Sequence, residues 1–142
     1  MAILVRNIIN LNPFAVVILA GINDIAQNTG PNTIQMIKNN IISMIELANS
    51  NKIHVILCSV LPTEKFPWFP EILPAQKVVD LNKELREYAD KNNILYVDYF
   101  SLMVNETMGM KMEITKDGVH PTKKGYLIME KTLLKAISII LQ

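Results

Sequence analysis

The sequence has little of what marks fibrous, disordered or disulfide-rich proteins. Its 142 residues include five glycines and seven prolines, and half are hydrophobic, which excludes collagen-like, low-complexity and disordered chains. The one cysteine, Cys58, cannot form an internal disulfide, which fits a reducing compartment without proving one. A chain of this length buries roughly 68–70% of the surface that it exposes when unfolded. We therefore expect one ordinary domain over residues 1–142.

An excess of one charge and long apolar runs are also absent. Fourteen basic and thirteen acidic residues give a formal net charge of +1, so no nucleic-acid or anionic membrane partner is predicted. No apolar run approaches the ~20 residues of a membrane helix, and residues 1–11 lack the pattern of a signal peptide. We expect a soluble chain without a transmembrane segment. Its compartment stays open: cytoplasmic if Met1 is the true start, secreted if an upstream signal peptide was lost.

Three short apolar runs predict the strands of a parallel sheet, because continuous apolar runs rich in β-branched residues are typical of strands covered on both faces. These runs are residues 15–20, 53–59 and 94–98. Between and after them, apolar residues recur three and four positions apart, which predicts helices with one buried stripe. The stripes cover residues 34–48, 78–89 and 126–140. This alternation predicts an α/β fold with helices on both faces of the sheet.

Two connections interrupt the alternation. Residues 61–74 contain four prolines and three aromatic residues, which predicts a stiff surface loop. Its aromatic residues, Phe66, Trp68 and Phe69, either form a lip over an acyl or sugar group or pack on a neighbouring helix and pin the loop. The second connection, residues 101–117, is predicted to be polar with a short helix.

The first motif with chemical potential is Gly21-Ile22-Asn23-Asp24, directly after the first predicted strand. Ligands bind at this end of open α/β sheets. A glycine permits a sharp turn, and the Asn23 amide can direct a donor across the end of the sheet, as an oxyanion hole requires. The alternative is that Asn23 and Asp24 only close a turn and cap the next helix.

The second motif is Asp117-Gly118-Val119-His120-Pro121, just before the last predicted helix. The Asp117 carboxylate can bind one ring nitrogen of His120 and leave the other free to take a proton, which is the base and orienting half of a nucleophilic triad. Gly118 allows the bend, and Pro121 is predicted in the first turn of the helix. The alternative is a plain Asp-Gly turn followed by a helix start.

Together the two motifs resemble those of the GDSL-type, or SGNH, esterases and lipases. In that family Gly-x-Asn-Asp follows the third strand, Asp-x-x-His precedes the last helix, and the elements between them come in the order predicted here. The resemblance covers the whole chain. It implies a flavodoxin-like, three-layer α/β/α fold with a parallel sheet. It also implies hydrolysis of carboxylic esters of lipids, small acyl groups or acetylated sugars, with no metal and no organic cofactor.

Matched by position, the resemblance assigns roles to individual residues. It implies Asn23 as the oxyanion donor, His120 as the general base and Asp117 as its orienting carboxylate. Gly21 and Asp24 would shape the site. Ile22 stands where the family normally has threonine, a minor departure.

The nucleophile of that family has no counterpart in the sequence. The family places it in a Gly-Asp-Ser motif after the first strand, and it takes a second oxyanion donor from a glycine after the second strand. None of the five serines here follows Gly-Asp. Only Ser59 lies near the expected site, as a weak substitute, and its neighbour Cys58 is predicted to be a small core hydrophobe. We therefore expect no nucleophile among these residues.

The simplest interpretation is that the chain begins inside the family's domain and lacks its first two strands. Two βα units would restore them, and residues 1–11, which are in helical register, would be the helix that leads into the third strand. Without these units one edge of the strand over residues 15–20 is bare. We therefore expect a homodimer that pairs through this edge.

Two functions remain open at this stage. The first is a GDSL-like lipase or acylhydrolase with a Ser-His-Asp mechanism whose serine lies outside this chain. The second is an inactive fragment that serves as a dimerising or carbohydrate-binding module. A nucleotide-binding domain is disfavoured, because no glycine-rich phosphate loop follows any predicted strand.

Overall fold

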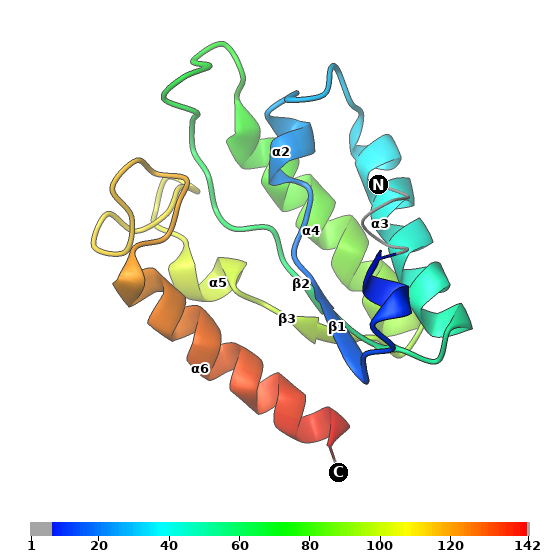
Figure 1. The fold of residues 1–142 in the computed structure, drawn as a ribbon. Coiled ribbons are helices and arrows are strands. Elements are labelled where there is room, and N and C mark those ends of the chain that lie inside the picture. The colour runs from blue at the N-terminus through cyan, green and yellow to red at the C-terminus, as the bar shows by residue number, and fades with distance from the viewer. Residues whose placement is uncertain (1–6, 142) are drawn as a thin grey trace.

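The computed structural model describes residues 7–141, in which parallel strands alternate with helices (Figure 1). The strands are β1 (Ala15–Ile18), β2 (His54–Cys58) and β3 (Leu95–Val97). The main helices are α2 (Ile22–Ile25), α3 (Ile34–Ser50), α4 (Pro74–Lys91), α5 (Phe100–Met103) and α6 (Lys123–Ile140). Residues 7–10 are also helical, and most of the helix predicted over residues 1–11 lies outside the described part of the chain.

The sheet has the order β1-β2-β3, with both pairs parallel. Ala15 lies opposite His54 and Cys58 lies opposite Val97, so β2 is the central strand. Each predicted strand is present but shorter than its apolar run, because strand pairing covers only part of the run. The open parallel sheet confirms the predicted α/β class.

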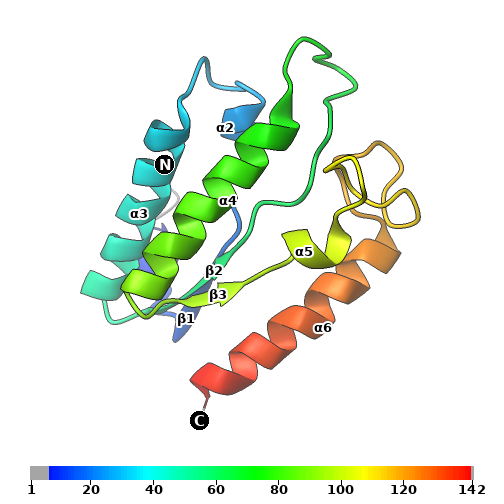
Figure 2. The same cartoon turned by 180° about the vertical axis from the view of Figure 1, so that it is seen from behind.

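Helices cover the sheet on both faces, which gives three layers (Figures 1 and 2). On one face α3 and α4 bury their apolar stripes in a core that contains Ile41, Ile45 and Leu81. On the other face α6 contributes Met129 and Ala136 to a second core. The central strand alternates between the two cores. Among residues 7–141, no helix is both long enough and apolar enough to cross a membrane.

One helix cap and two helix starts differ from the sequence-based expectation. The N-cap of α3 is Thr33, whose hydroxyl accepts from the Met36 N–H at 3.1 Å, so capping by Asn23 or Asp24 is wrong. Pro74 is the first residue of α4 and not the end of the loop, because proline fits the first turn of a helix.

The start of α6 also differs, because the helix begins at Lys123 with Thr122 as its N-cap. The prediction of Pro121 in the first helical turn is therefore wrong. Pro121 instead forms an isolated bridge with Thr115. Pro121 and Thr115 thereby close the base of the loop that carries Asp117 and His120.

Candidate functional site

Asp117 and His120 form a dyad on the loop before α6. The Asp117 Oδ2 atom lies 2.7 Å from His120 Nδ1. The Asp117 Oδ1 atom accepts the backbone N–H groups of Val119 and His120 at 2.9 and 2.8 Å. Because a carboxylate only accepts hydrogen bonds, Nδ1 carries the proton and Nε2 is left with its lone pair. The His120 side chain is 70% exposed, so that nitrogen is accessible.

These hydrogen bonds keep Asp117 ionised. They hold its pKa well below the usual range, with the His120 N–H as the largest cause and the His120 ring second. The buried hydroxyl of Thr115 supports the same turn. It accepts from the Gly118 N–H at 3.0 Å and donates to the His120 carbonyl at 2.8 Å. The carboxylate is thus fixed in both charge and position before any ligand binds.

The dyad loop is anchored to α6 by close packing. The Thr122 N–H donates to the carbonyl oxygen of Ile114 at 2.8 Å. A Cβ atom at Gly125, in the first turn of α6, would lie 2.8 Å from Pro121 Cβ and 2.9 Å from the Ile114 oxygen. The absence of a side chain at Gly125 therefore lets the helix approach the loop.

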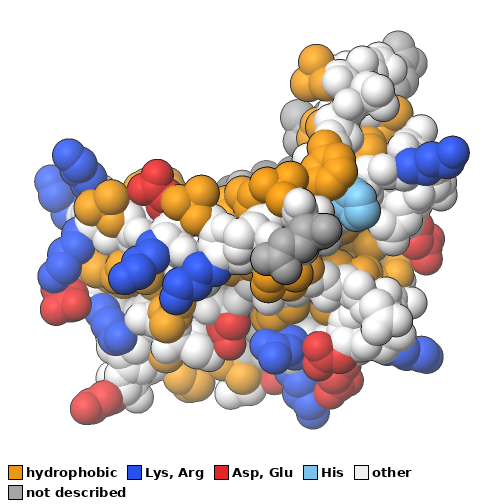
Figure 3. Space-filling model, turned by 90° about the horizontal axis from the view of Figure 1, so that it is seen from below, with side chains coloured by type: hydrophobic (Ala, Val, Ile, Leu, Met, Phe, Trp, Pro, Cys, Tyr) orange, Lys and Arg blue, Asp and Glu red, His pale blue; other side chains and the backbone are white. Residues whose placement is uncertain are grey.

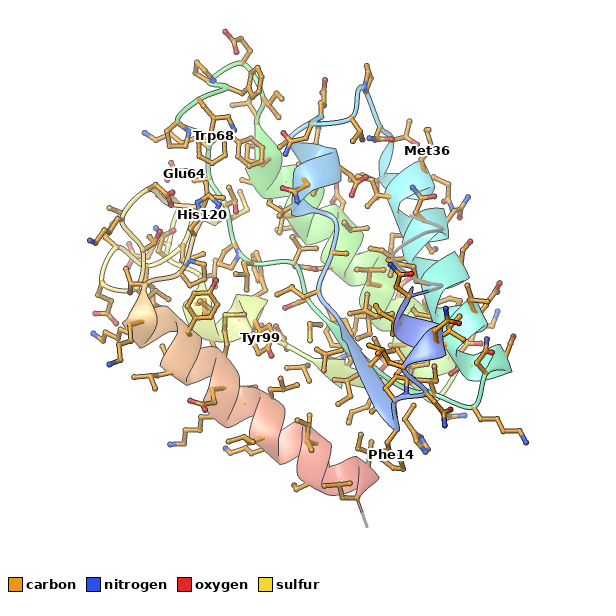
Figure 4. All side chains as sticks on the ribbon, in the orientation of Figure 1. Phe14, Met36, Glu64, Trp68, Tyr99 and His120 are labelled. Carbon is orange, nitrogen blue, oxygen red and sulfur yellow. The ribbon has the colours of Figure 1, made fainter. Side chains whose placement is uncertain are left out.

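The aromatic residues of the loop after β2 have different positions. Phe66 is 1% exposed and belongs to the core under α3 and α4, so a lip role for Phe66 is wrong. Trp68 and Phe69 are each 47% exposed. The indole of Trp68 stacks on the imidazole of His120 (Figure 4). The burial of Phe66 therefore supports the alternative in which the rings pin the loop, while Trp68 reaches the candidate site.

A buried asparagine holds the chain where it leaves β2. The Asn82 side chain on α4 accepts from the Val60 N–H at 2.7 Å and donates to the Val60 carbonyl at 2.9 Å. These two bonds satisfy backbone groups that the end of the strand leaves unpaired. The loop that carries Trp68 therefore starts from a fixed point.

The Gly21–Asp24 motif forms the turn after β1. Gly21 has φ of 118° and is the N-cap of α2, as the sequence predicted for a sharp bend. Asn23 is exposed, and its Oδ1 accepts from Asn28 Nδ2 at 3.3 Å. Within residues 7–141 its amide N–H₂ group has no hydrogen-bond partner, and no hydrogen bond links Asn23 to His120. Asp24 lies half-buried in the first turn of α2.

No serine is placed as a nucleophile in the described residues. The Ser59 side chain is buried, and its oxygen accepts from the Phe100 N–H at 2.8 Å. The other serine hydroxyls donate to neighbouring groups, in Ser43, Ser50, Ser101 and Ser138. Cys58 is buried in the core under α6, and burial raises the pKa of its thiol to about 11. The prediction of a core role for Cys58 is therefore confirmed by its position.

The sequence model of the GDSL-like lipase/acylhydrolase family matches residues 3–128, which is most of the chain. The chain belongs to this family. Among curated proteins no significant match was found. The dyad and the Gly21–Asp24 turn therefore lie within the matched range of a GDSL-like domain.

Two solved structures from Bacteroides are similar to this GDSL-like chain in both sequence and fold. A candidate acylhydrolase from B. fragilis is 46% identical with a TM-score of 0.94, over 96% of this chain and 67% of that one. A GDSL-like lipase from B. thetaiotaomicron is 49% identical with a TM-score of 0.91, over 94% and 66%. The chain therefore spans about two thirds of the length of either protein.

A more distant structure shares the fold alone. It is a catalytic mutant of an acetylxylan esterase from Geobacillus stearothermophilus, which is 20% identical with a TM-score of 0.72 over 94% of this chain and 67% of that one. The three-layer fold is thus shared at low sequence identity.

Sequence reasoning missed two residues that support this GDSL-like site. Asn82 lies among the apolar positions of the α4 stripe, and a polar residue in such a stripe is a usable signal of a buried hydrogen bond. Thr115 stands two positions before Asp117, but a threonine in a polar loop gives no such signal. The Trp68–His120 stack joins two distant loops and has no signature in a single sequence.

The low pKa of Asp117 predicts how stability depends on pH. The native pKa lies below the unfolded value of about 3.9, so the carboxylate stabilises the fold above about pH 4 and this contribution is lost as the pH falls further. We expect Asp117→Asn to lower the free energy of unfolding at pH 7, and the deficit to shrink below about pH 4.

Urea unfolding of both proteins between pH 3 and pH 7 measures this deficit. Asp80→Asn is the matched control, because Asp80 is an exposed carboxylate on α4 that accepts one bond from the Gln76 side chain. We expect the control to change stability little at any pH. An equal loss in the free energy of unfolding for Asp117→Asn at pH 3 and pH 7 would contradict the lowered pKa of Asp117.

Proposed function

We propose that this chain carries the base, the orienting carboxylate and an oxyanion donor of a Ser-His-Asp acyl-ester hydrolase. The observation that supports this most is the 2.7 Å contact between His120 Nδ1 and Asp117, which leaves Nε2 exposed. The nucleophilic serine belongs to a part of the domain outside these residues. Two facts support this: the chain spans about two thirds of its Bacteroides relatives, and the described serines are engaged elsewhere.

The proposed reaction proceeds in two halves. The serine oxygen attacks the ester carbonyl carbon while its proton passes to His120 Nε2, and the Asp117 carboxylate stabilises the resulting imidazolium. The amide of Asn23 donates to the oxyanion. The imidazolium then protonates the departing alcohol and leaves an acyl-serine. In the second half His120 takes a proton from water while the water oxygen attacks the acyl carbon. The imidazolium then returns a proton to the serine oxygen, which leaves as the free serine hydroxyl while the carboxylic acid is released.

The proposed substrates are small acyl esters, of lipids or of acetylated sugars. The exposure of the His120 ring supports an open site that a bulky alcohol group can reach. The structural relatives include a GDSL-like lipase and an acetylxylan esterase, so they cover both classes. Assays with a short-chain triacylglycerol and an acetylated xylo-oligosaccharide separate them.

A chimera tests this function. The part of the B. thetaiotaomicron lipase that this chain does not cover is joined to this chain, and hydrolysis of p-nitrophenyl acetate is measured for the chimera and for the chain alone. We expect the chimera to be at least about 10³-fold faster, because a triad without its nucleophile retains only its residual catalysis. A folded but inactive chimera would overturn the proposal.

The alternative of a dimerising module is favoured by one observation, the apolar edge of β1. In the part of the chain that the structure describes, no strand pairs with the outer edge of β1. Val17, Leu19 and Phe14 are more than 40% exposed, and a groove of about 160 Å³ runs along the strand. In the view from below, hydrophobic side chains lie among charged ones on the surface of the molecule (Figure 3).

We propose that two copies of the isolated chain pair through this β1 edge, because an uncovered apolar edge strand readily accepts another strand. Light scattering of the chain at micromolar concentration should give the mass of a dimer, and Val17→Lys should give a monomer. The chimera should also be a monomer, since its added segment covers the edge. A monomeric wild-type chain would contradict the pairing.

A further inference from the structure

The rings of Trp68 and His120 stack although they come from two different loops. Their centroids are 5.9 Å apart and their planes differ by 28°. Trp68 belongs to the loop after β2, and His120 belongs to the loop before α6 (Figure 4). The contact therefore exists only when both loops are in their native positions.

The His120 ring needs a second constraint besides Asp117. Its side chain is 70% exposed, and in the described chain the bond from Nδ1 to Asp117 is the one hydrogen bond that the ring makes. A single hydrogen bond at Nδ1 leaves the plane of the ring free to rotate. The direction in which Nε2 points is then not fixed. A flat surface against one face of the ring removes that freedom.

Trp68 can supply this surface because it is itself held. The buried ring of Phe66 lies 5.8 Å from the indole at 33°. The Phe69 N–H donates to the Phe66 carbonyl at 3.1 Å and closes a turn around Pro67 and Trp68. Pro67 restricts the backbone of that turn further. A rigid turn on a core aromatic thus presents the indole to His120.

We propose that Trp68 is a positioning residue for His120: its indole face fixes the plane of the imidazole ring, directs Nε2 toward the site of ester attack, and attracts the imidazolium that forms there. The inference rests on the proposed function, because His120 acts as a base only in that reaction. It differs from a substrate lip, since His120 itself occupies one face of the indole.

Charged groups around this pair must stay constant in a test. Asp117 contacts the ring directly, and Glu64, Lys65 and Lys116 line a cavity of about 510 Å³ together with Asp117. The Glu64 carboxylate accepts from the Thr107 hydroxyl at 3.0 Å. Exchanging Trp68 for Phe or Leu leaves all of these charges in place.

The test is ¹⁵N NMR of the histidine tautomers at a pH where both rings are neutral, in the full 142-residue chain. The chain has two histidines, and His120→Gln assigns the signals. We expect Trp68→Leu to lower the ratio of the Nδ1–H to the Nε2–H tautomer of His120 by about two- to fivefold, the effect of losing one contact between neutral aromatic rings. Trp68→Phe should retain most of the wild-type ratio.

The control is Phe69→Leu, which removes an equally exposed aromatic ring from the same loop and should leave the ratio unchanged. His54 reports the fold, because its ring lies 4.7 Å from Phe14. If Trp68→Leu leaves the ratio unchanged while His54 is undisturbed, the positioning role is wrong. If Trp68→Leu disturbs the His54 signals, the test relies on Trp68→Phe instead. A lowered tautomer ratio of His120 in that variant would also contradict the positioning role.

The measurement needs no hydrolysis, so its failure is distinct from an inactive chimera. An unchanged tautomer ratio in an active chimera background overturns the role of Trp68 alone. An inactive chimera overturns the proposed function, whatever the ratio shows.

Discussion

Replacing His120 by alanine in the active chimera should reduce kcat for p-nitrophenyl acetate by about 10²- to 10⁴-fold, the contribution of a well-placed general base. The structure provides the reason: the Asp117 carboxylate occupies Nδ1 at 2.7 Å and leaves Nε2 as the proton acceptor. Alanine removes this acceptor, and the other histidine cannot replace it, because His54 begins β2 at the opposite end of the sheet.

His54→Ala is therefore the matched control, and it should leave kcat within about twofold of the unmodified chimera.

Asn23→Ala should reduce kcat by about 10²- to 10³-fold with little change in KM, since an oxyanion donor acts in the transition state. Steady-state measurements of kcat and KM for all three variants test these expectations. Equal losses for His54→Ala and His120→Ala would contradict the assignment of the base.

Gly21→Ala should destabilise the fold by about 2–5 kcal/mol, which combines backbone strain with overpacking. Gly21 has φ of 118°, where a side chain is strained. An added Cβ would lie 2.8 Å from Leu81 Cδ2 and 3.4 Å from methyl groups of Ile37 and Val60. These neighbours are fully buried, so they cannot move aside without disturbing the core under α3 and α4.

Gly30→Ala isolates the strain from the crowding. Gly30 also has a positive φ, of 104°, but an added Cβ there meets nothing within 4 Å. We expect it to cost about 1–2 kcal/mol, from the backbone alone. Urea unfolding followed by circular dichroism measures both variants, and equal losses for the two would show that crowding at Gly21 has no effect.

The long elements could be predicted from the sequence because each has one buried stripe. Ile37, Ile41 and Ile45 lie on one face of α3, and all three are buried in the structure. The dyad could be predicted because Asp117 and His120 are three residues apart on one loop. In both cases the residues that interact are close in sequence, so local spacing carries the information.

Contacts between distant segments could not be predicted in the same way. The burial of Phe66 and the exposure of Trp68 depend on which side of the loop faces α4, and the proline pattern is the same for either arrangement. The start of α6 was predicted too early because Pro121 is equally compatible with a helix start and with the bridge to Thr115. Only packing against Gly125 distinguishes a helix start at Pro121 from the bridge to Thr115.

The dyad loop is fastened to both hydrophobic cores. Val119, between the two dyad residues, is buried with the α3 and α4 side, whereas Ile114, at the start of the loop, is buried with the α6 side. The loop is therefore packed against the cores on both faces of the sheet, and the alignment of the carboxylate and the imidazole depends on both layers at once. Loosening either layer would stop proton transfer while most of the secondary structure was still intact, so catalysis in this domain should fail earlier than its circular dichroism signal on heating.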